Sequence, residues 1–139
     1  GTTLKQAGSK QNQYKIDVNY QYTMAKIAAS KGVEKLILVS SAGANEKSGN
    51  FYLRMKGELD STVQKLDFKT THILRPGQLY GNRKQNRPFE KAAINLMFFL
   101  NKLGIARKYR PIHANDLAKR MIQLIESQNS GILTLDELF

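Results

Sequence analysis

The strongest constraint on the fold is a pair of short apolar runs that do not alternate between polar and apolar residues. They read LILVSS at residues 36–41 and THILRPG at residues 71–77. A strand that is apolar on both faces must be covered on both, which is typical of a parallel sheet. Between the runs, apolar residues recur at helical spacing: Tyr52, Met55, Leu59, Val63 and Leu66. A strand, helix, strand order of this kind predicts parallel strands joined by right-handed crossovers, and therefore an α/β fold.

Two more helices are expected from the same kind of pattern. Residues 13–31 carry apolar side chains at helical spacing, and Gly32 is well placed to end that helix. Pro88 suits the first turn of another helix, which would run to about Leu103. Helices between strands are needed to cover the faces of a parallel sheet.

The C-terminal part predicts a last helix and a last strand. The helix begins close to Asn115 or Asp116, whose short acceptor side chains can cap free N–H groups. The sequence GILTL at residues 131–135 predicts the strand. A polar loop at residues 77–87 follows the carboxyl end of a predicted strand, which is the edge where ligands bind in an open parallel sheet.

Composition excludes several classes of protein. With 139 residues, we expect one domain. The most apolar run, residues 92–100, is far shorter than the roughly 20 residues that span a bilayer, so no membrane partner is expected. No basic and then apolar leader opens the chain, so no secretory signal is expected. The absence of cysteine favours a cytoplasmic location, and two histidines are too few for the usual zinc site, so no metal is expected.

Positive charge is concentrated in one part of the chain, which has a net charge of +11. Between Arg83 and Arg120 lie ten Lys or Arg residues against only Glu90 and Asp116. Such a block is compatible with an anionic partner, either nucleic acid or a cofactor, and also with a solvated basic face. No nucleic-acid motif or interleaved aromatic residues accompany the charge, so nucleic acid ranks last among these interpretations.

Tyr52 and Lys56 form the candidate site for chemistry. Residues four apart lie on one face of a helix, so the Lys56 ammonium can approach the Tyr52 phenol. A nearby cation stabilises the phenolate, which would let Tyr52 act as a general acid or base near neutral pH. Ser40 and Ser41 end a predicted strand at its carboxyl edge, where a hydroxyl can hold a ligand oxygen. Tyr52 also fits the apolar stripe of its helix, and a purely structural role stays open.

Five segments together resemble the short-chain dehydrogenase/reductase superfamily, in particular its atypical members with a Tat-interacting-protein-like or NmrA-like NAD(P)-binding fold. They are GTTLKQAGS, GVEKLILVSSAGAN, NFYLRMKGELD, ILRPGQLYG and RPIHANDLAKRMIQLIE, which begin at residues 1, 32, 50, 73 and 110. The resemblance covers nearly the whole chain. It implies that residues 1–139 form one domain, the second half of a doubly wound parallel sheet of the Rossmann type.

The resemblance also implies roles for individual residues. Tyr52 would be the acid/base, Lys56 would hold the nicotinamide ribose, and Ser41 would orient the substrate oxygen, with Ser40 as the fallback. Pro76 and Gly77 would lie along the nicotinamide. The remaining cofactor-binding residues would line its ribose side: Gly1, Thr2 and Thr3.

The implied function is hydride transfer by an NAD(P)-dependent oxidoreductase. The expected substrate is an unidentified small molecule, either a carbonyl or alcohol compound or a sugar nucleotide as in epimerase-like relatives. The alternative is a dinucleotide-binding redox sensor or regulatory module that catalyses no reaction. The glycine-rich phosphate-binding half of the family's domain has no counterpart in these residues, so the choice between NAD and NADP cannot be read from its motif, although NADP is favoured. A homodimer formed through residues 13–31 and 51–66 is a further expectation, as is a missing segment beside the sheet.

Several other residues allow two interpretations. His113 could contact a substrate, but its place just before a helix favours a structural role. Arg75 could reach a substrate or form a buried ion pair, and Tyr80 could cover the cofactor or anchor its loop. Three residues of the long loop could meet an anionic substrate or simply be solvated: Arg83, Lys84 and Arg87.

Overall fold

The computed structural model describes residues 2–81 and 111–139. Three strands form the main sheet: β1 (Lys35–Val39), β2 (Thr70–Arg75) and β5 (Gly131–Thr134). Their order is β1-β2-β5, and both pairings are parallel. The prediction of a mixed α/β protein with a parallel sheet is therefore confirmed. The helix expected from Pro88 to about Leu103 lies outside the described residues.

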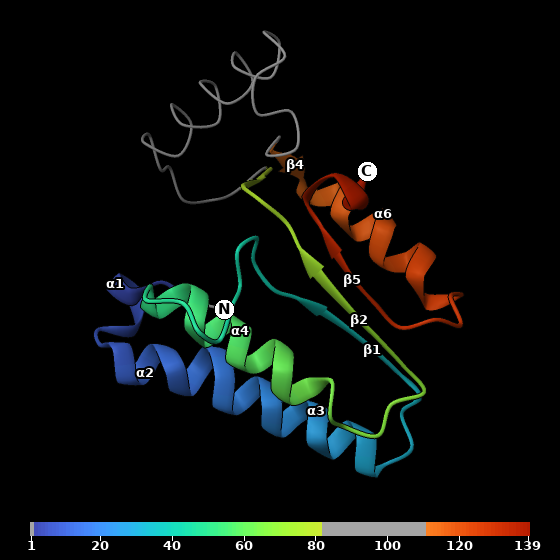
Figure 1. The fold of residues 1–139 in the computed structure, drawn as a ribbon, viewed down its shortest axis with the longest axis horizontal. Coiled ribbons are helices and arrows are strands. Elements are labelled where there is room, and N and C mark those ends of the chain that lie inside the picture. Colours follow the sequence, from blue (N-terminus) through green and yellow to red (C-terminus); the bar gives the residue numbers. More distant parts are fainter. Residues whose placement is uncertain (1, 82–110) are drawn as a thin grey trace, which may run out of the picture.

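One side of the sheet is covered by the helices that precede β1 and by the helix that follows it (Figure 1). The first group runs without a break through α2 (Lys10–Tyr14), η1 (Lys15–Asn19) and α3 (Tyr20–Ser30). The second is α4 (Phe51–Val63). Their buried side chains form one core with the sheet: Val18, Ala25, Met55, Leu59, Val63 and Ile73.

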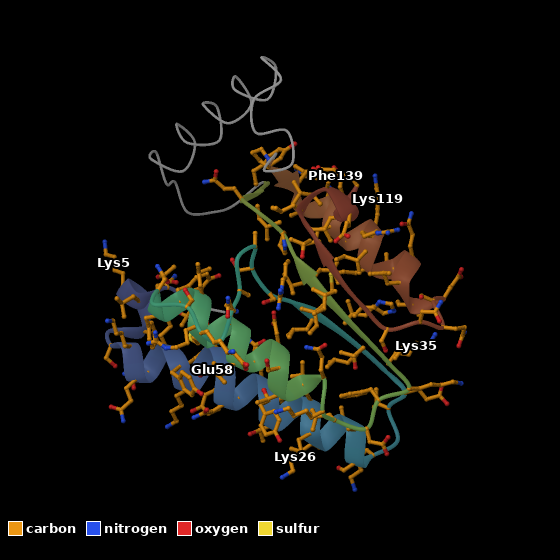
Figure 2. The ribbon with its side chains drawn as sticks, viewed as in Figure 1. Lys5, Lys26, Lys35, Glu58, Lys119 and Phe139 are labelled. Atoms are coloured by element: carbon orange, nitrogen blue, oxygen red, sulfur yellow. The ribbon has the colours of Figure 1, made fainter. Side chains whose placement is uncertain are left out.

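The helix expected over residues 13–31 differs from the prediction in one respect. Its second segment, η1, is a π-helix, in which each backbone hydrogen bond joins residues five apart instead of four. The expected end is confirmed, because α3 stops at Ser30 and Gly32 adopts a φ of +78°, a left-handed conformation that glycine tolerates well. Burial raises the pKa of the Tyr14 phenol on α2, and the carboxylate of Glu58 on α4, labelled in Figure 2, adds to this effect.

The other side of the sheet is covered by α6 (Ala114–Ile125) (Figure 1). It forms a second core with side chains of the sheet and the C-terminus: Leu74, Ile112, Leu117, Leu124 and Leu138. Lys35, labelled in Figure 2, joins the start of β1 to the end of this helix. Its ammonium donates hydrogen bonds to the carbonyls of Ile125 at 2.6 Å and Ser127 at 3.0 Å. A cation at a helix C-terminus is favourable because the last carbonyls carry partial negative charge.

A second, two-stranded sheet was not predicted. It pairs β3 (Leu79–Tyr80) with β4 (Ile112–His113) in parallel. The cap of α6 also differs from the prediction, because the ring Nδ1 of His113 accepts the Asn115 N–H at 3.2 Å in place of a cap by Asn115 or Asp116. A short 3₁₀-helix, η3 (Leu135–Leu138), ends the chain.

Candidate functional site

The loop that follows β1 lies beside the turn that follows β2. The Ser40 N–H donates to the Leu74 carbonyl and the Ala42 N–H donates to the Pro76 carbonyl, each at 2.8 Å. These bonds continue the parallel pairing past the ends of both strands. They place Ser41 next to the Pro76 turn at the carboxyl edge of the sheet, where ligands bind in open parallel sheets.

Tyr52 and Lys56 lie one turn apart on α4, as their spacing predicts. The helix begins where the Asn50 side chain accepts the Leu53 N–H at 3.2 Å. Tyr52 is 40% exposed, whereas Lys56 is only 5% exposed. The Lys56 ammonium lies 6.0 Å from the centroid of the Tyr52 ring, at the outer limit of a cation–π contact.

Within the described ranges, the Lys56 ammonium has no hydrogen-bond acceptor and no carboxylate partner. The nearest acid whose charge it influences is Asp60, one turn further along α4. That carboxylate is bound by Arg75 instead, whose Nε donates to Asp60 Oδ2 at 2.8 Å. The Lys56 side chain is largely buried and its ammonium has no partner in the described part of the chain, so Lys56 is available to an incoming acceptor.

Asp60, Arg75 and Ser40 form a buried polar cluster under the strand ends. Asp60 is 1% exposed, and burial raises the pKa of its carboxyl even though Ser40, Arg75 and Lys56 all act to lower it. The Ser40 hydroxyl is near enough to Asp60 to lower the pKa of its carboxyl, although Ser40 Oγ and Asp60 Oδ1 have no hydrogen-bond partner in the described part of the chain. Of the two interpretations of Arg75, the ion pair is the one observed.

Ser41 is placed differently from Ser40. Its hydroxyl donates a long hydrogen bond of 3.4 Å to the Ala42 carbonyl and is partly buried. This weak local bond can be exchanged for one to a ligand. Among the described interactions none joins Ser41 to Tyr52, so the structure brings Ser41 to the Pro76–Gly77 turn and Tyr52 to Lys56 without direct contact between the two groups.

The N-terminal residues are tied to η1. The Thr2 N–H donates to Asp17 Oδ1 at 2.7 Å, and the Gln13 side chain donates to the Thr2 carbonyl at 3.0 Å. The Thr3 hydroxyl donates to the Gln6 side chain at 3.0 Å in the capping box of α1 (Leu4–Ala7). Its side chain is therefore engaged in local structure. Gly1 lies outside the described residues.

Tyr80 and His113 pack against one another across the second sheet. Their ring centroids are 5.0 Å apart in an edge-on arrangement, and His113 also caps α6. The structural role expected for His113 is confirmed. The loop residues Arg83, Lys84 and Arg87 lie outside the described residues.

Sequence reasoning missed Gly57, which brings α4 against the loop after β1. A Cβ atom at this position would lie 2.2 Å from the Glu46 nitrogen and 2.3 Å from the Asn45 carbonyl carbon. The sequence shows a glycine directly after Lys56. The need for glycine at this position comes from its contact with a loop whose place in the fold no local sequence pattern predicts. This close approach sets the distance from the loop that follows Ser41 to the helix that carries Lys56.

No group of three His, Cys, Asp or Glu side chains that could hold a metal ion occurs within residues 2–81 and 111–139. In the same ranges, no helix has the length and apolar character needed to cross a bilayer.

Fold and site together define a mixed α/β protein with a small parallel sheet and a tyrosine–lysine pair near the carboxyl edge. No family model matches the chain. Its sequence is similar to mitochondrial proteins named fmp52 or FMP52. It is 46% identical to the Emericella nidulans protein over 104 residues, which make up 75% of this chain and 43% of that relative.

Two other relatives match over more of the chain. The Kluyveromyces lactis protein FMP52, mitochondrial, is 41% identical over 129 residues, 88% of this chain and 56% of that protein. The Candida albicans protein of the same name is 37% identical over 134 residues, 96% of this chain and 58% of that protein. The chain thus spans about half the length of the curated relatives it matches.

These comparisons contradict the family predicted from the sequence. The relatives carry a different name and no family model matches, so the identification as an atypical short-chain dehydrogenase/reductase was wrong. The predicted oxidoreductase function and its redox-sensor alternative lose their basis, because they rested on that identification. The cytoplasmic location is also wrong, since the relatives are named as mitochondrial proteins. The family prediction rested on five short segments in a familiar order, and a fold that such segments indicate does not fix a function.

Proposed function

We propose that these residues belong to a mitochondrial protein that binds a dinucleotide, NAD or NADP, at the carboxyl edge of β1 and β2. In this proposal Ser41, Tyr52 and Lys56 exchange a proton with an oxygen atom of a small molecule bound beside it. The observation that carries the proposal is Lys56, which is 5% exposed and whose ammonium has no acceptor in the described part of the chain.

The donors at this edge fit a nucleotide. The Lys56 ammonium and the Ser41 and Tyr52 hydroxyls can each bind a ribose hydroxyl or a phosphate oxygen. Burying an ammonium costs free energy unless a partner is supplied, and a bound ribose would supply one. The Pro76–Gly77 turn adds a surface without charged side chains, on which the flat face of a nicotinamide ring can lie.

The three polar side chains would divide the proton transfer among them. Tyr52, the most exposed of the three, would donate or accept the proton at its phenol oxygen. The ammonium of Lys56 would stabilise the phenolate form. Ser41 would hold the reacting oxygen in place with its hydroxyl, giving up its weak bond to the Ala42 carbonyl.

Other residues would act around the dinucleotide rather than on the proton. Ser40 would hold the end of β1 through its backbone bond to Leu74 and would stabilise the charged form of Asp60, so its effect on the ligand would be indirect. Thr2, whose peptide is held by Asp17 and Gln13, would line the cofactor's ribose side together with Thr3.

We also infer the finer architecture that such a site requires. The parallel order β1-β2-β5, with helices on both faces, supports the second half of a doubly wound sheet of the Rossmann type. In that arrangement the described carboxyl edge would form one wall of a ligand crevice.

The mitochondrial location is supported by the names of the relatives. It is tested by expressing the complete polypeptide that contains these residues with a C-terminal epitope and separating mitochondria from cytosol. We expect the protein in the mitochondrial fraction. Recovery in the cytosol would overturn the location.

Dinucleotide binding is tested by isothermal titration of the complete polypeptide with NAD and with NADP. The key variant is Lys56→Met, which removes the ammonium and keeps the length of the side chain. We expect at least tenfold weaker binding, about 1.4 kcal/mol or more. The matched control is Lys65→Met, an exposed lysine just beyond the same helix, which should leave affinity unchanged. Tyr52→Phe should weaken binding less, because it removes a hydroxyl but no charge.

Two results would overturn the proposal. The first is that neither dinucleotide binds. The second is that Lys56→Met binds as tightly as the unchanged protein. Loss of affinity in both lysine variants would show that general positive charge, rather than this site, attracts the ligand.

A further inference from the structure

The helices that precede β1 carry positive charge on their outer surface. Residues 2–31, which hold α1, α2, η1 and α3, contain five lysines, and all five are exposed: Lys5, Lys10, Lys15, Lys26 and Lys31. The acid within these residues is Asp17, which is 1% exposed and accepts the Thr2 N–H. The lysines therefore have no exposed carboxylate on their own helices, and an excess of positive charge on a surface attracts anions.

Two of these lysines line a surface pocket of about 510 Å³. The pocket lies where α2, η1 and α3 run alongside the start of α4 (Figure 1). Its walls include charged, aromatic and amide side chains: Lys10, Lys15, Tyr14, Tyr20, Phe51 and Asn19. The volume falls in the range of about 300–1,000 Å³ that is typical of sites for small molecules.

Each of the two lysines rests on an aromatic ring of the same pocket. Lys10 Nζ lies 5.5 Å from the centroid of the Phe51 ring, and Lys15 Nζ lies 5.8 Å from that of the Tyr20 ring. Neither ammonium has an ion pair or a hydrogen bond with a described residue. A cation–π contact holds an ammonium in place but leaves its charge unneutralised. Both charges are therefore available to an anion in the pocket.

The backbone at this pocket is also unusual. Lys15 and Asn19 are the first and last residues of the π-helix η1, and both line the pocket. Short π-helical turns are rare and are frequently found at functional sites. Asn19 adds an amide and Thr23 a hydroxyl that can donate hydrogen bonds to a ligand. Burial and the Glu58 carboxylate raise the pKa of the Tyr14 phenol, so Tyr14 stays neutral and brings no negative charge to the pocket.

We propose that this pocket binds the phosphate monoester of a small molecule that carries an aromatic ring. A phosphate monoester has a charge of about −1.5 to −2 near neutral pH, which matches two ammoniums better than a carboxylate does. The phosphate group alone would leave most of the pocket empty, and aromatic walls favour a flat ring as the remainder of the ligand. The pocket goes beyond the dinucleotide site, because Ser41, Tyr52 and Lys56 are not among its described lining residues.

The first test compares three probes on the complete polypeptide that contains these residues. Para-fluorophenyl phosphate carries both ring and phosphate, and its dissociation constant is measured by fluorine NMR. Para-fluorophenol has the ring alone, and inorganic phosphate, added as a competitor, has the anion alone. We expect the ester to bind at least about tenfold more tightly than either fragment. The proposal is overturned if the ester does not bind, or if inorganic phosphate binds as tightly as the ester.

The second test removes single charges. Lys10→Gln and Lys15→Gln should each weaken binding of the ester about fivefold, as expected for the loss of an exposed charge pair. The matched control is Lys26→Gln on α3, labelled in Figure 2, which removes an exposed lysine that does not line the pocket. We expect no change in this control. Equal weakening in all three variants would assign the binding to general positive charge and would overturn the pocket.

A third comparison separates this pocket from the dinucleotide site. Lys10→Gln should leave the affinity for NAD and NADP unchanged, and Lys56→Met should leave the affinity for the ester unchanged. If no dinucleotide binds but the ester and the lysine variants behave as expected, the proposed function fails and the pocket stands. If Lys56→Met weakens binding of the ester as much as Lys10→Gln does, the ester occupies the dinucleotide site and the separate pocket is overturned.

Discussion

Gly57 of α4 lies against the backbone of Glu46, so closely that a Cβ atom on Gly57 would lie 2.2 Å from the Glu46 nitrogen. Helix and loop therefore touch backbone to backbone. The Asn45 N–H reinforces the contact by donating to the Leu53 carbonyl at 3.0 Å. Because Lys56 directly precedes Gly57, this contact fixes how far the buried ammonium lies from the loop that follows Ser41.

Gly57→Ala should therefore affect stability and the ligand site together. The added methyl group cannot be accommodated unless α4 and the loop separate, and such overpacking costs about 2 kcal/mol or more. The matched control is Gly49→Ala, since nothing lies within 4 Å of a Cβ at that position. The measurement is urea unfolding followed by dinucleotide titration. Equal unfolding midpoints for the two variants would contradict the packing described for Gly57.

The Asp60–Arg75 ion pair leads to a second prediction. Asp60→Ala leaves the Arg75 guanidinium without its partner, in a cluster where Asp60 is 1% exposed. Removing one partner of a buried pair costs about 3 kcal/mol. Glu34→Ala breaks an exposed pair with Lys69 and should cost less than about 1 kcal/mol. Chemical denaturation at neutral pH compares the two variants. Equal losses of stability would show that the buried ion pair stabilises the fold no more than the exposed one.

His72 leads to a prediction about pH. It is 2% exposed in β2, and both of its ring nitrogens lack a hydrogen-bond partner among the described residues. Burial lowers the pKa of His72 below 6.5, and the charges of Lys35 and Arg120 add to this effect. The unfolded chain therefore binds a proton that the folded chain resists. The resulting stability is present above about pH 6.5 and is lost as pH falls through the lowered folded pKa.

His72→Leu should remove this pH dependence. We expect the unchanged protein to lose stability relative to the variant as pH decreases from 7.5 to 5, as measured by urea unfolding at each pH. Other titrating groups are common to both proteins, so the difference between them isolates His72. Parallel curves over this range would rule out a neutral buried imidazole.

The elements that could be predicted from the sequence are those whose signal is local. The apolar runs predicted β1 and β2, because a strand buried on both faces needs a continuous apolar run. Apolar residues at helical spacing predicted α4, because a helix buried on one face needs that spacing. Strands β3 and β4 could not be predicted, because each has only two residues and their pairing joins Leu79 to Ile112 across a long stretch of chain. The π-helix η1 left no signal either, because Ile16 within it and Tyr20 at the start of α3 keep ordinary helical spacing.

The residues of the candidate site also fall into those that the sequence predicts and those that it does not. Tyr52 and Lys56 were found because helix geometry alone brings residues four apart together. The cluster of Ser40, Asp60 and Arg75 joins three separate elements, so no spacing in the sequence reveals it. The family was mistaken for a related reason, since short segments in a familiar order report a fold more readily than a function.

The last prediction separates a functional lysine from a structural one. Lys56 is 5% exposed, and its ammonium has neither an ion pair nor a hydrogen bond with any described residue. If the lysine serves a ligand, its charge adds nothing to the unliganded fold, and an apolar side chain of similar length should pack better in its largely buried position. Lys56→Met should therefore raise the free energy of unfolding by about 1 kcal/mol without ligand, while it weakens dinucleotide binding. Lys65→Met, the exposed control, should change stability by less than about 0.5 kcal/mol. Denaturant unfolding of both variants decides the matter, and a loss of stability in Lys56→Met would mean that the ammonium supports the fold rather than a ligand.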